Sequence, residues 1–384
     1  MKTKFQLLLI AALFFTISSC VKEGVDVEYN YYDEEGYVEM KKVLNLPETP
    51  MAYHNEYPSY YINSSSFSFN RDLATLGRVI FYDKALSSDG TISCASCHDQ
   101  AAAFADNKQF SDGVDGKVTA RNSLALGSVF SFQEYYGSII SNRVPFFWDN
   151  RANNVEDQSR ETFANDREMN MEMHDVVNAM NNQPYYRPLL KVIRGSEVAD
   201  EYTALEAVSV FVNSISSYNS LYDDALSEYF DENQNLDNIR TAELPLFSPI
   251  ENQGKEFYIT NCGGCHGATN GLPGELMANN GLDLDYEDEG MGNGVFKVPT
   301  LRNITLTAPY MHDGRFATID DVLDHYSGGI KNHTYLSSQL EKPDGTARPI
   351  LITTSDREAL KAFFNTFLDD EALTAEKYSD PFIQ

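Results

Sequence analysis

Two Cys-x-x-Cys-His motifs constrain this 384-residue chain more than any other feature. The motif residues are Cys94, Cys97 and His98 in the first copy and Cys262, Cys265 and His266 in the second. In each copy, two thiols three positions apart can form thioether bonds to the two vinyl groups of a haem, and the adjacent histidine can ligate the iron. Zinc is the alternative, but it would need four ligands at each site. The sequence therefore predicts two covalently bound haem c groups, with His98 and His266 as iron ligands.

Residues 1–20 have the pattern of an export signal. Lys2 and Lys4 precede an apolar run over residues 7–15, which is too short to span a bilayer, and two serines then lead to Cys20. A cysteine in this context resembles a bacterial lipobox, so we expect Cys20 to be the lipidated first residue of the mature protein. A cleaved secretion signal without lipid is the alternative. The predicted location is the bacterial cell envelope, lipid-anchored, on the periplasmic side or at the outer membrane.

The chain is strongly acidic, with a formal net charge of -28. Binding to nucleic acid needs clustered lysines and arginines, so no nucleic-acid partner is expected. An acidic surface can attract a basic redox partner, and acidity that serves only solubility is the alternative.

The composition changes between the export signal and the first motif. Residues 21–64 are rich in Tyr, Asp, Glu, Ser and Asn without a sustained period, which predicts a flexible tether. From Arg71 onwards, apolar residues recur at helical spacing and predict a helix that leads into the first motif.

The rest of the chain divides into two haem domains. A long helix is predicted over 203–230, and the polar stretch after it separates an N-terminal domain, 65–235, from a C-terminal domain, 236–384. A capping box of Ser355 and Glu358 predicts a last helix, which is a candidate to pack back on the first domain. Strand signals are scarce. The predicted class is therefore mainly α, with two haem domains in tandem and long loops.

The surroundings of the first motif predict an open sixth position on its iron. No histidine occurs between His98 and His174, and no methionine occurs between the motif and Met169. An open haem can bind peroxide, and cleavage of the O–O bond then needs a proton acceptor and polar groups beside it.

Four segments carry a resemblance to a known family. LGRVIFYDKALSSDGTISCASCH, FWDNRANNVEDQ, CGGCHG and FKVPTLRNITLTAPYMHDGRFATIDDVLDHY together resemble the bacterial diheme cytochrome c peroxidase family, which includes the MauG-like enzymes. The resemblance covers residues 65–370. It implies two mainly helical cytochrome c-like domains whose haems face a shared interface. The N-terminal haem would react with hydrogen peroxide, and the C-terminal haem would supply electrons.

The resemblance also implies roles for three residues near the first haem. Gln158 and Glu168 match the family's pair beside bound peroxide, and Trp148 matches a tryptophan between the haems. A carboxylate in a haem pocket can shuttle a proton, and an indole can relay electrons. A solvated glutamate and an ordinary core tryptophan are the alternatives.

A calcium ion at the domain interface is a further implication of the resemblance. The matching positions are Asn122, Thr307 and Pro309, through side-chain or backbone oxygens. Three neutral oxygens without a carboxylate would not indicate calcium without the resemblance.

Two departures from the common family pattern concern the axial positions. The loop SDGVDGKVTARNS lacks the histidine that many members carry, so the first haem is expected to react without prior reduction of the second. The usual methionine ligand of the second haem is replaced by Tyr326, as in MauG-like members. A phenolate ligand would lower the potential of this haem. Other candidates for the same position are His325, Met311, Met291 and Met277, and His312 is expected to have a structural role or to contact a propionate.

Three functions follow as hypotheses. The first is a peroxidase that reduces hydrogen peroxide with electrons from a small periplasmic cytochrome c or cupredoxin. The second is a MauG-like diheme oxidase that modifies a protein or small molecule through high-valent iron. The third is a diheme electron carrier without turnover. Family members are often homodimers, so a homodimer is a further expectation from the resemblance.

Overall fold

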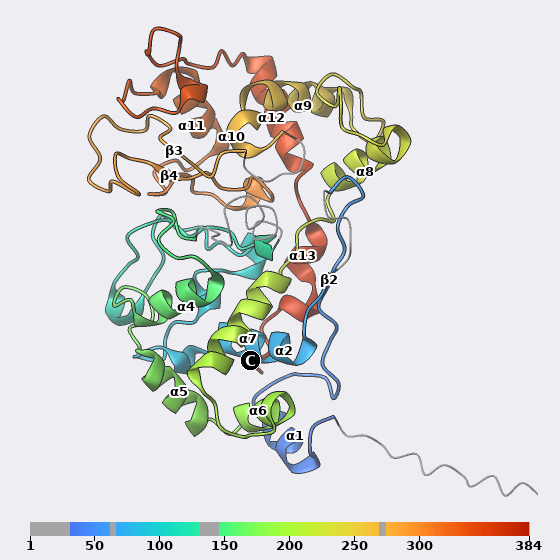
Figure 1. Ribbon diagram of the computed structural model, residues 1–384, viewed down its shortest axis with the longest axis vertical. Coiled ribbons are helices and arrows are strands. Elements are labelled where there is room, and N and C mark those ends of the chain that lie inside the picture. Colours follow the sequence, from blue (N-terminus) through green and yellow to red (C-terminus); the bar gives the residue numbers. More distant parts are fainter. Residues whose placement is uncertain (1–30, 62–66, 131–145, 269–273, 384) are drawn as a thin grey trace, which may run out of the picture.

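The computed structural model describes residues 31–61, 67–130, 146–268 and 274–383. The predicted export signal, the lipidation site Cys20 and residues 21–30 of the predicted tether lie outside these ranges. The described chain is mostly helical, with two small two-stranded sheets and long loops, so the predicted class is confirmed. Figure 1 shows two groups of helices, one formed mainly by the first half of the chain and one by the second.

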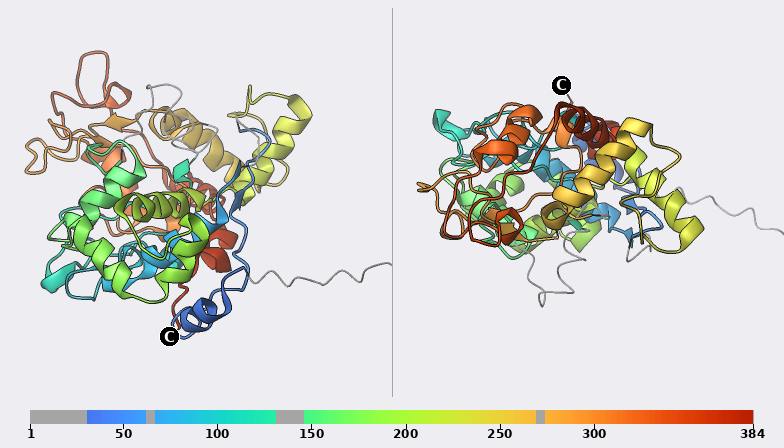
Figure 2. Two further views of the ribbon diagram at one scale, coloured as in Figure 1. Left: turned by 60° about the horizontal axis from the view of Figure 1, so that its bottom comes forward. Right: turned by 90° about the horizontal axis from the view of Figure 1, so that it is seen from above.

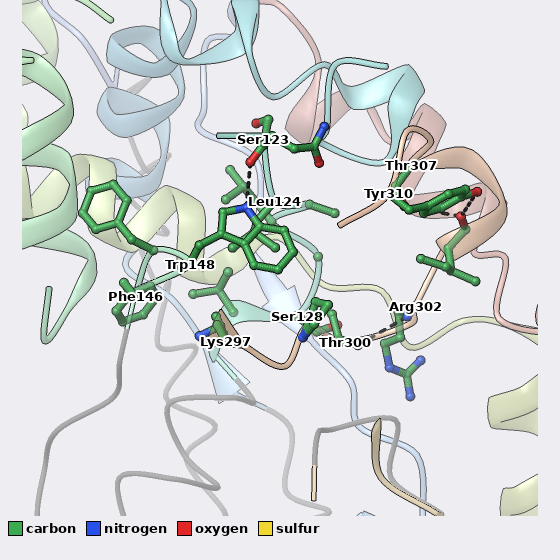
Figure 3. A pocket seen from close by; sticks show the side chains of 18 of the residues that line it. Ser123, Leu124, Ser128, Phe146, Trp148, Lys297, Thr300, Arg302, Thr307 and Tyr310 are labelled. Atoms are coloured by element: carbon green, nitrogen blue, oxygen red, sulfur yellow. Dashed lines mark hydrogen bonds between the residues drawn. The ribbon is translucent and has the colours of Figure 1, made fainter. Parts of the chain in front are cut away.

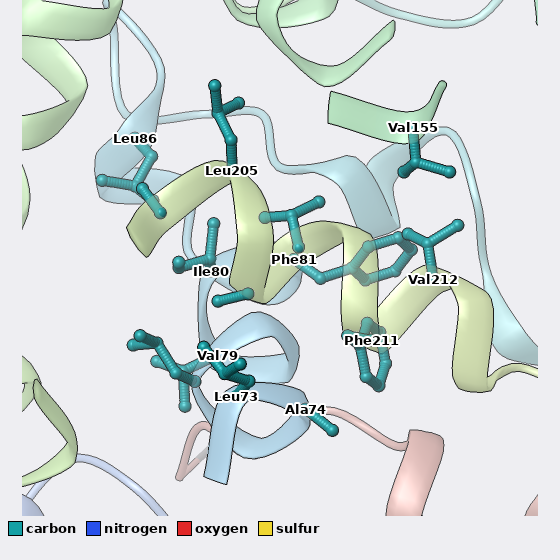
Figure 4. Close-up of a cluster of buried hydrophobic side chains, with 14 of the residues drawn as sticks. Leu73, Ala74, Val79, Ile80, Phe81, Leu86, Val155, Leu205, Phe211 and Val212 are labelled. Carbon is teal, nitrogen blue, oxygen red and sulfur yellow. The ribbon is translucent and has the colours of Figure 1, made fainter. Parts of the chain in front are cut away.

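A pair of crossed helices forms the centre of the first core. Helix α2 (Arg71–Tyr82) begins after Asn70, whose side chain accepts hydrogen bonds from the first backbone amides. It packs against α7 (Glu201–Ser214) through Phe81, Phe211 and neighbouring aliphatic side chains (Figure 4). A Cβ atom on Gly77 would lie 1.9 Å from the carbonyl oxygen of Ala207, so only glycine allows this close crossing.

Further helices surround this pair on the side of the first haem motif. They are α4 (Val155–Ala164), α5 (Met173–Asn182) and α6 (Tyr186–Arg194), with short turns η1 (Lys84–Leu86), η2 (Cys94–Ser96), η3 (Gln100–Ala102) and η4 (Val114–Gly116).

The prediction of a flexible tether is wrong for residues 31–61. This segment contains α1 (Glu34–Met40), and β1 (His54–Asn55) pairs with β2 (Phe67–Ser68) in an antiparallel sheet. Tyr32, Met40 and Tyr53 are buried in the first core. Tyrosine gives a polar composition to a sequence, but its ring buries a large apolar area when it packs in a core.

The predicted helix over 203–230 is two helices. Helix α7 ends at Ser214, and α8 (Leu221–Asn233) begins after Ser220, which forms a capping box with Asp223. The apolar side of α8 belongs to the second core, through Tyr222 and Leu226.

The second core repeats the crossed pair of the first. Helix α9 (Pro249–Asn261) packs against α12 (Thr354–Asn365), and a Cβ on Gly254 would lie 2.0 Å from the carbonyl oxygen of Ala359. The capping box of α12 is Thr353 with Asp356, which corrects the predicted Ser355 and Glu358. The remaining elements of this half are α10 (Gly263–His266), β3 (Met277–Ala278), β4 (Phe296–Lys297), η5 (Ile304–Leu306), α11 (Ile319–Asp324), the π-helical turn η6 (His325–Gly329) and η7 (Ser338–Leu340).

A buried ion pair joins the two cores. Arg302 donates two hydrogen bonds to the carboxylate of Asp223 at 2.8 and 2.9 Å, and both side chains are almost fully buried. Tyr60 completes the group by donating to the same carboxylate at 2.6 Å. The guanidinium also contacts the carbonyl oxygen of Ser217 at 2.7 Å, so a buried charge from the second half of the chain is surrounded by partners from the first half.

The C-terminal residues return to the first core. After α13 (Asp370–Thr374) and η8 (Glu376–Tyr378), Tyr378 is buried and donates a hydrogen bond of 2.6 Å to the carbonyl oxygen of Ser214. Arg78 of α2 donates to the carbonyl oxygen of Ser379 at 2.6 Å. The chain therefore ends beside the first group of helices, as Figures 1 and 2 show.

Helices of bilayer-spanning length and hydrophobicity are not found in the part of the chain that the structure describes.

Candidate haem sites and the contact between them

A cavity beside the first Cys-x-x-Cys-His motif gathers the residues predicted for the first haem. Cys94 begins η2, and His98 follows two residues after that turn. Segments distant in sequence supply the other walls. The cavity is lined by the three motif residues, by Trp148, Gln158 and Glu168, by Arg121 and Asp149, and by apolar side chains that include Phe81 and Val212.

The ring of His98 is held through one nitrogen. Its Nδ1 lies 2.8 Å from the carbonyl oxygen of Phe104, and Ser123 Oγ is 3.3 Å away. With Nδ1 donating to a carbonyl, Nε2 carries no proton and can ligate iron. Burial lowers the pKa of His98, which keeps the imidazole neutral, as ligation needs. These residues fit a haem on the first motif.

The second motif repeats this arrangement at the end of α9. Nδ1 of His266 lies 3.0 Å from the carbonyl oxygen of Pro299, and burial lowers the pKa of this imidazole as well. None of the four motif cysteines forms a disulfide within the described residues, so all four are available for haem attachment. Burial raises the pKa of Cys94 and of Cys262 to about 12, so these thiols are protonated until thioether bonds form. The donor set and the cavity fit a second haem.

Glu168 lies in the first cavity on a turn that two neighbours fix. Asn165 donates a hydrogen bond of 2.7 Å to its Oε1, and the backbone amide of Val114 donates to its carbonyl oxygen at 3.0 Å. A Cβ on Gly113 would lie 1.9 Å from the carbonyl oxygen of Arg167, so this loop needs glycine to approach the Glu168 turn. Burial raises the pKa of Glu168, and the bond from Asn165 opposes that rise only in part.

Gln158 and Trp148 stand where the cavities meet. Gln158 lies on α4 and lines the first cavity together with a third, intermediate cavity. Trp148 lines the first, the intermediate and the second cavity. In Figure 3 its indole lies among Phe146, Lys297 and Leu124 in the intermediate cavity. One aromatic side chain therefore contacts the space of both candidate haem sites.

The candidate sixth ligands of the second haem are separated by the structure. Tyr326 lines the second cavity with His266, and burial raises the pKa of its hydroxyl well above the ordinary range. His325 is not among the residues that line this cavity, and its Nε2 lies 3.0 Å from the carbonyl oxygen of Asn280. Met311 also lines the cavity, and its sulfur accepts a hydrogen bond of 3.3 Å from the Asn280 side chain.

The remaining candidates lie differently. Met277 and Met291 are exposed and are absent from the lining of the second cavity. His312 is buried in that lining and stacks on Phe296, with ring centres 3.7 Å apart. This stacking agrees with a packing role for His312.

Asn122, Thr307 and Pro309 all line the intermediate cavity. The carbonyl oxygen of Asn122 accepts a hydrogen bond of 2.8 Å from Trp148, and its side-chain amide donates to the carbonyl oxygen of Lys108 at 2.8 Å. The Oδ1 of Asn122 and the carbonyl oxygens of the other two residues are left as neutral oxygen donors. Calcium accepts such donors, but a set without a carboxylate binds it weakly.

Sequence reasoning did not single out Lys297, which is placed between the cavities. Its backbone amide donates a hydrogen bond of 2.7 Å to the carbonyl oxygen of Trp148, and its ammonium lies 5.6 Å from the centre of the Phe146 ring. Burial lowers the pKa of Lys297 to about 7. The only signal in the sequence was a lysine within the apolar segment FKVP.

Two carboxylates also hold Arg121 at the mouth of the first cavity, a contact that sequence reasoning missed. Arg121 pairs with Asp149 at 2.7 Å and with Asp288 at 2.6 Å. Asp288 belongs to the second half of the chain, so this group ties the halves together beside the candidate site. Long-range ion pairs leave no local pattern in a sequence.

Comparisons with known proteins agree with this arrangement. The di-haem cytochrome c peroxidase family matches residues 71–230. The methylamine utilization protein MauG of Paracoccus denitrificans is 30% identical over 294 residues, which cover 66% of this chain and 74% of that protein. Cytochrome c551 peroxidase of Nitrosomonas europaea is 28% identical over 270 residues, which cover 66% of this chain and 72% of the relative. The crystal structure of a MauG-like protein associated with microbial copper homeostasis superimposes with a TM-score of 0.64 at 27% identity, covering 85% of this chain and 96% of the other.

Proposed function

The chain belongs to the di-haem cytochrome c peroxidase family, and we propose that it reduces hydrogen peroxide at the His98 site with electrons from the His266 site. The family implies two c-type haems and an oxidoreductase with peroxidase activity. The observation that carries the proposal is that Trp148 lines both cavities. When bound, the two haems supply the irons that bind peroxide and transfer electrons.

Glu168 is the proposed proton carrier. Its half-buried carboxylate would take a proton from one peroxide oxygen and give it to the other, which would leave as water. A pKa raised by burial suits this role, because the same group must accept and then release a proton. Gln158 on α4 donates an amide hydrogen to the peroxide and orients it towards Glu168.

Trp148 is the proposed electron path between the sites. The indole is buried, and its ring nitrogen is fixed by the carbonyl oxygen of Asn122, so its position between the two cavities is constant. Each peroxide needs two electrons and two protons to give two water molecules. The electrons pass from the His266 site through the indole, and the protons enter from solvent through Glu168.

Tyr326 is the proposed sixth ligand at the His266 site. Its side chain lines that cavity, whereas the neighbouring His325 ring is engaged with the carbonyl oxygen of Asn280. A tyrosine ligand at this position closes the second site to peroxide and lowers its potential.

The partners and location complete the proposal. Relatives that are named cytochrome c peroxidases support a redox protein as electron donor. We propose a small cytochrome c or a cupredoxin, a basic one because the chain carries a net charge of -28. A lipid on Cys20 would hold the enzyme on the periplasmic side or at the outer membrane, where two copies would form a homodimer.

A calcium ion at Asn122, Thr307 and Pro309 is also part of the proposal. All three residues line the intermediate cavity next to Trp148, so a cation there would hold the relay and the domain interface in place. Elemental analysis of the protein after treatment with a calcium chelator tests it: loss of calcium with slower peroxide turnover is expected, and absence of calcium from the purified protein contradicts it.

A second function is favoured by Tyr326. The relatives include MauG as well as cytochrome c peroxidases, and a low-potential second haem would retain oxidising equivalents rather than accept electrons quickly. In that case the oxidised pair of haems would modify another protein or a small molecule.

Steady-state peroxide consumption with a reduced small cytochrome c as donor separates these functions. If the protein is a peroxidase, the donor should be oxidised rapidly and in proportion to the peroxide consumed. In Glu168→Gln the rate of donor oxidation should be almost zero. A long-lived change in both haem spectra after peroxide addition, without oxidation of the donor, would favour the second function. Haem spectra that do not respond to peroxide would contradict both.

A further inference from the structure

Two adjacent tyrosines share one buried carboxylate behind the first haem motif. The hydroxyls of Tyr185 and Tyr186 each donate a hydrogen bond of 2.7 Å to the same oxygen, Oδ2, of Asp83. Asp83 is 3% exposed, and its other oxygen accepts a bond of 2.9 Å from the backbone amide of Ala85. Within the described residues Asp83 has no cationic partner within salt-bridge distance, so the two phenols are the main compensation for a buried negative charge.

This group lies next to the attachment site of the first haem. Asp83 caps the end of α2, whose Phe81 lines the first cavity, and the same helix packs against η2, which begins at Cys94. Tyr186 is fully buried beside Asp83. Cys94 also packs against the core cluster that contains both tyrosines. A haem joined to Cys94 through a thioether would thus be attached to a segment that packs against the helix ending at Asp83.

We propose that Tyr186, with Asp83 as proton acceptor and Tyr185 as second member, is a redox-active tyrosine site that reduces the oxidised first haem when electrons from the second haem do not arrive. The proposal rests on the proposed function only for the source of the oxidant, which is hydrogen peroxide. It adds a second electron source that does not use Trp148.

The chemistry balances within the three side chains. Tyr186 loses one electron to the oxidised haem, and its phenolic proton moves along the 2.7 Å hydrogen bond to Oδ2 of Asp83, which leaves a neutral tyrosyl radical. The rings of Tyr186 and Tyr185 are 4.9 Å apart. An electron then passes from Tyr185 to the radical, while Asp83 returns its proton to Tyr186 and takes the proton of Tyr185.

The second step moves the radical outwards. Tyr185 keeps 5% of its surface exposed, whereas Tyr186 keeps none. The outer ring also contacts Phe382 near the C-terminus, with ring centres 5.8 Å apart. A reductant in solution can therefore return the missing electron to Tyr185 without entering the haem cavity, and Asp83 gives the proton back to the Tyr185 oxygen.

The chain contains a matched control for this site. Tyr60 also donates to a buried carboxylate, Asp223, at 2.6 Å, but two hydrogen bonds from Arg302 already neutralise that carboxylate. Tyr60→Phe removes the same type of hydrogen bond from the group that joins the two cores.

Freeze-quench electron paramagnetic resonance on the full diheme protein tests the site. The protein is mixed with hydrogen peroxide, and separately with a peracid, without electron donor. The wild type is expected to give a radical signal that narrows when its tyrosines carry deuterium. Tyr186→Phe and Asp83→Asn are expected to lose it, and Tyr60→Phe to keep it. A spin trap added in solution should react with the radical when it reaches Tyr185. Tyr185→Phe should keep the radical on Tyr186 but lose this reaction with the spin trap.

Two results would overturn the proposal. One is a radical signal of wild-type size in both Tyr186→Phe and Asp83→Asn, with haem spectra that respond to the oxidant. The other is a radical that Tyr60→Phe removes equally. A peracid needs no help from Glu168 in cleaving its O–O bond, so a radical with peracid but no spectral response to hydrogen peroxide would contradict the proposed function and leave the tyrosine site supported. No radical with either oxidant contradicts the tyrosine site.

Discussion

The indole nitrogen of Trp148 donates a hydrogen bond of 2.8 Å to the backbone carbonyl oxygen of Asn122, and this bond fixes a ring that lines both candidate haem cavities. In Trp148→Phe the bond is lost, which costs about 1 kcal/mol of stability. Electron transfer between the haems should slow by about tenfold or more, equivalent to ~1.4 kcal/mol in the barrier. Stopped-flow spectra of the reduced second haem after peroxide addition measure this rate. A wild-type rate in the variant would show that the indole is not the path.

Glu168→Gln should lower peroxide turnover by roughly 10²- to 10⁴-fold, because an amide cannot carry the proton between the two peroxide oxygens. The matched control is Glu161→Gln, which removes an exposed carboxylate on the neighbouring helix that pairs with Arg151 at 2.7 Å. That control should keep nearly full turnover. Equal losses in the two variants would mean that the net charge near the cavity, rather than proton transfer, sets the rate.

The pH dependence of turnover should follow the raised pKa of Glu168. Because the carboxylate must be ionised to accept a proton, turnover should fall as the pH is lowered through a pKa above the usual 4.5. The folded protein also binds this proton more tightly than the unfolded chain. The contribution to stability is therefore full below the unfolded pKa and is lost as the pH rises through the folded one. In Glu168→Gln, turnover should no longer fall at low pH for this reason. If the fall at low pH persists in the variant, a group other than Glu168 causes it.

Tyr326→Met should raise the reduction potential of the second haem, because a thioether favours ferrous iron more than a phenolate does. A rise on the order of 0.1 V lies well inside the ~0.8 V range that axial ligands span. Spectroelectrochemical titration measures it. His325→Gln serves as the control, since His325 is absent from the cavity lining and its ring contacts the carbonyl oxygen of Asn280. The potential of the second haem in this control should match that of the wild type. A shift in the control alone would assign the ligand to His325.

Asp223→Asn should destabilise the protein by about 3–5 kcal/mol, because it leaves the buried Arg302 charge without its partner. By contrast, removing the exposed Arg151 pair through Glu161→Gln should cost at most about 1 kcal/mol. Denaturant unfolding followed by circular dichroism compares the two. A small loss for Asp223→Asn would indicate that water reaches Arg302 between the cores.

Local chemistry in the sequence was enough to predict the haem motifs and the helices that precede them. Cys94, Cys97 and His98 lie within five positions, so their joint use needs no knowledge of the fold. The helix pairs are marked by apolar periodicity. The partner of His98 Nδ1, the carbonyl oxygen of Phe104, could not be predicted, because every residue carries the same backbone group.

Errors arose where tertiary packing overrides composition. The segment 31–61 has the polar composition of a linker, but its tyrosines are buried in the first core. The break between α7 and α8 also lacks a proline or glycine to mark it, and only the capping box of Ser220 and Asp223 signals the new helix. The acceptor of the Trp148 indole bond depends on the folded position of the Asn122 loop and therefore has no local signature.

The return of the C-terminal residues to the first core sets an order for biogenesis. Tyr378 and Ser379 contact Ser214 and Arg78, so the domain with the first haem motif lacks part of its core until residues 378 and 379 have been synthesised. Thioether formation at Cys94 and Cys97 can then take place on a chain that has not closed around the haem. A chain that stops before Tyr378 would leave the first core without these contacts.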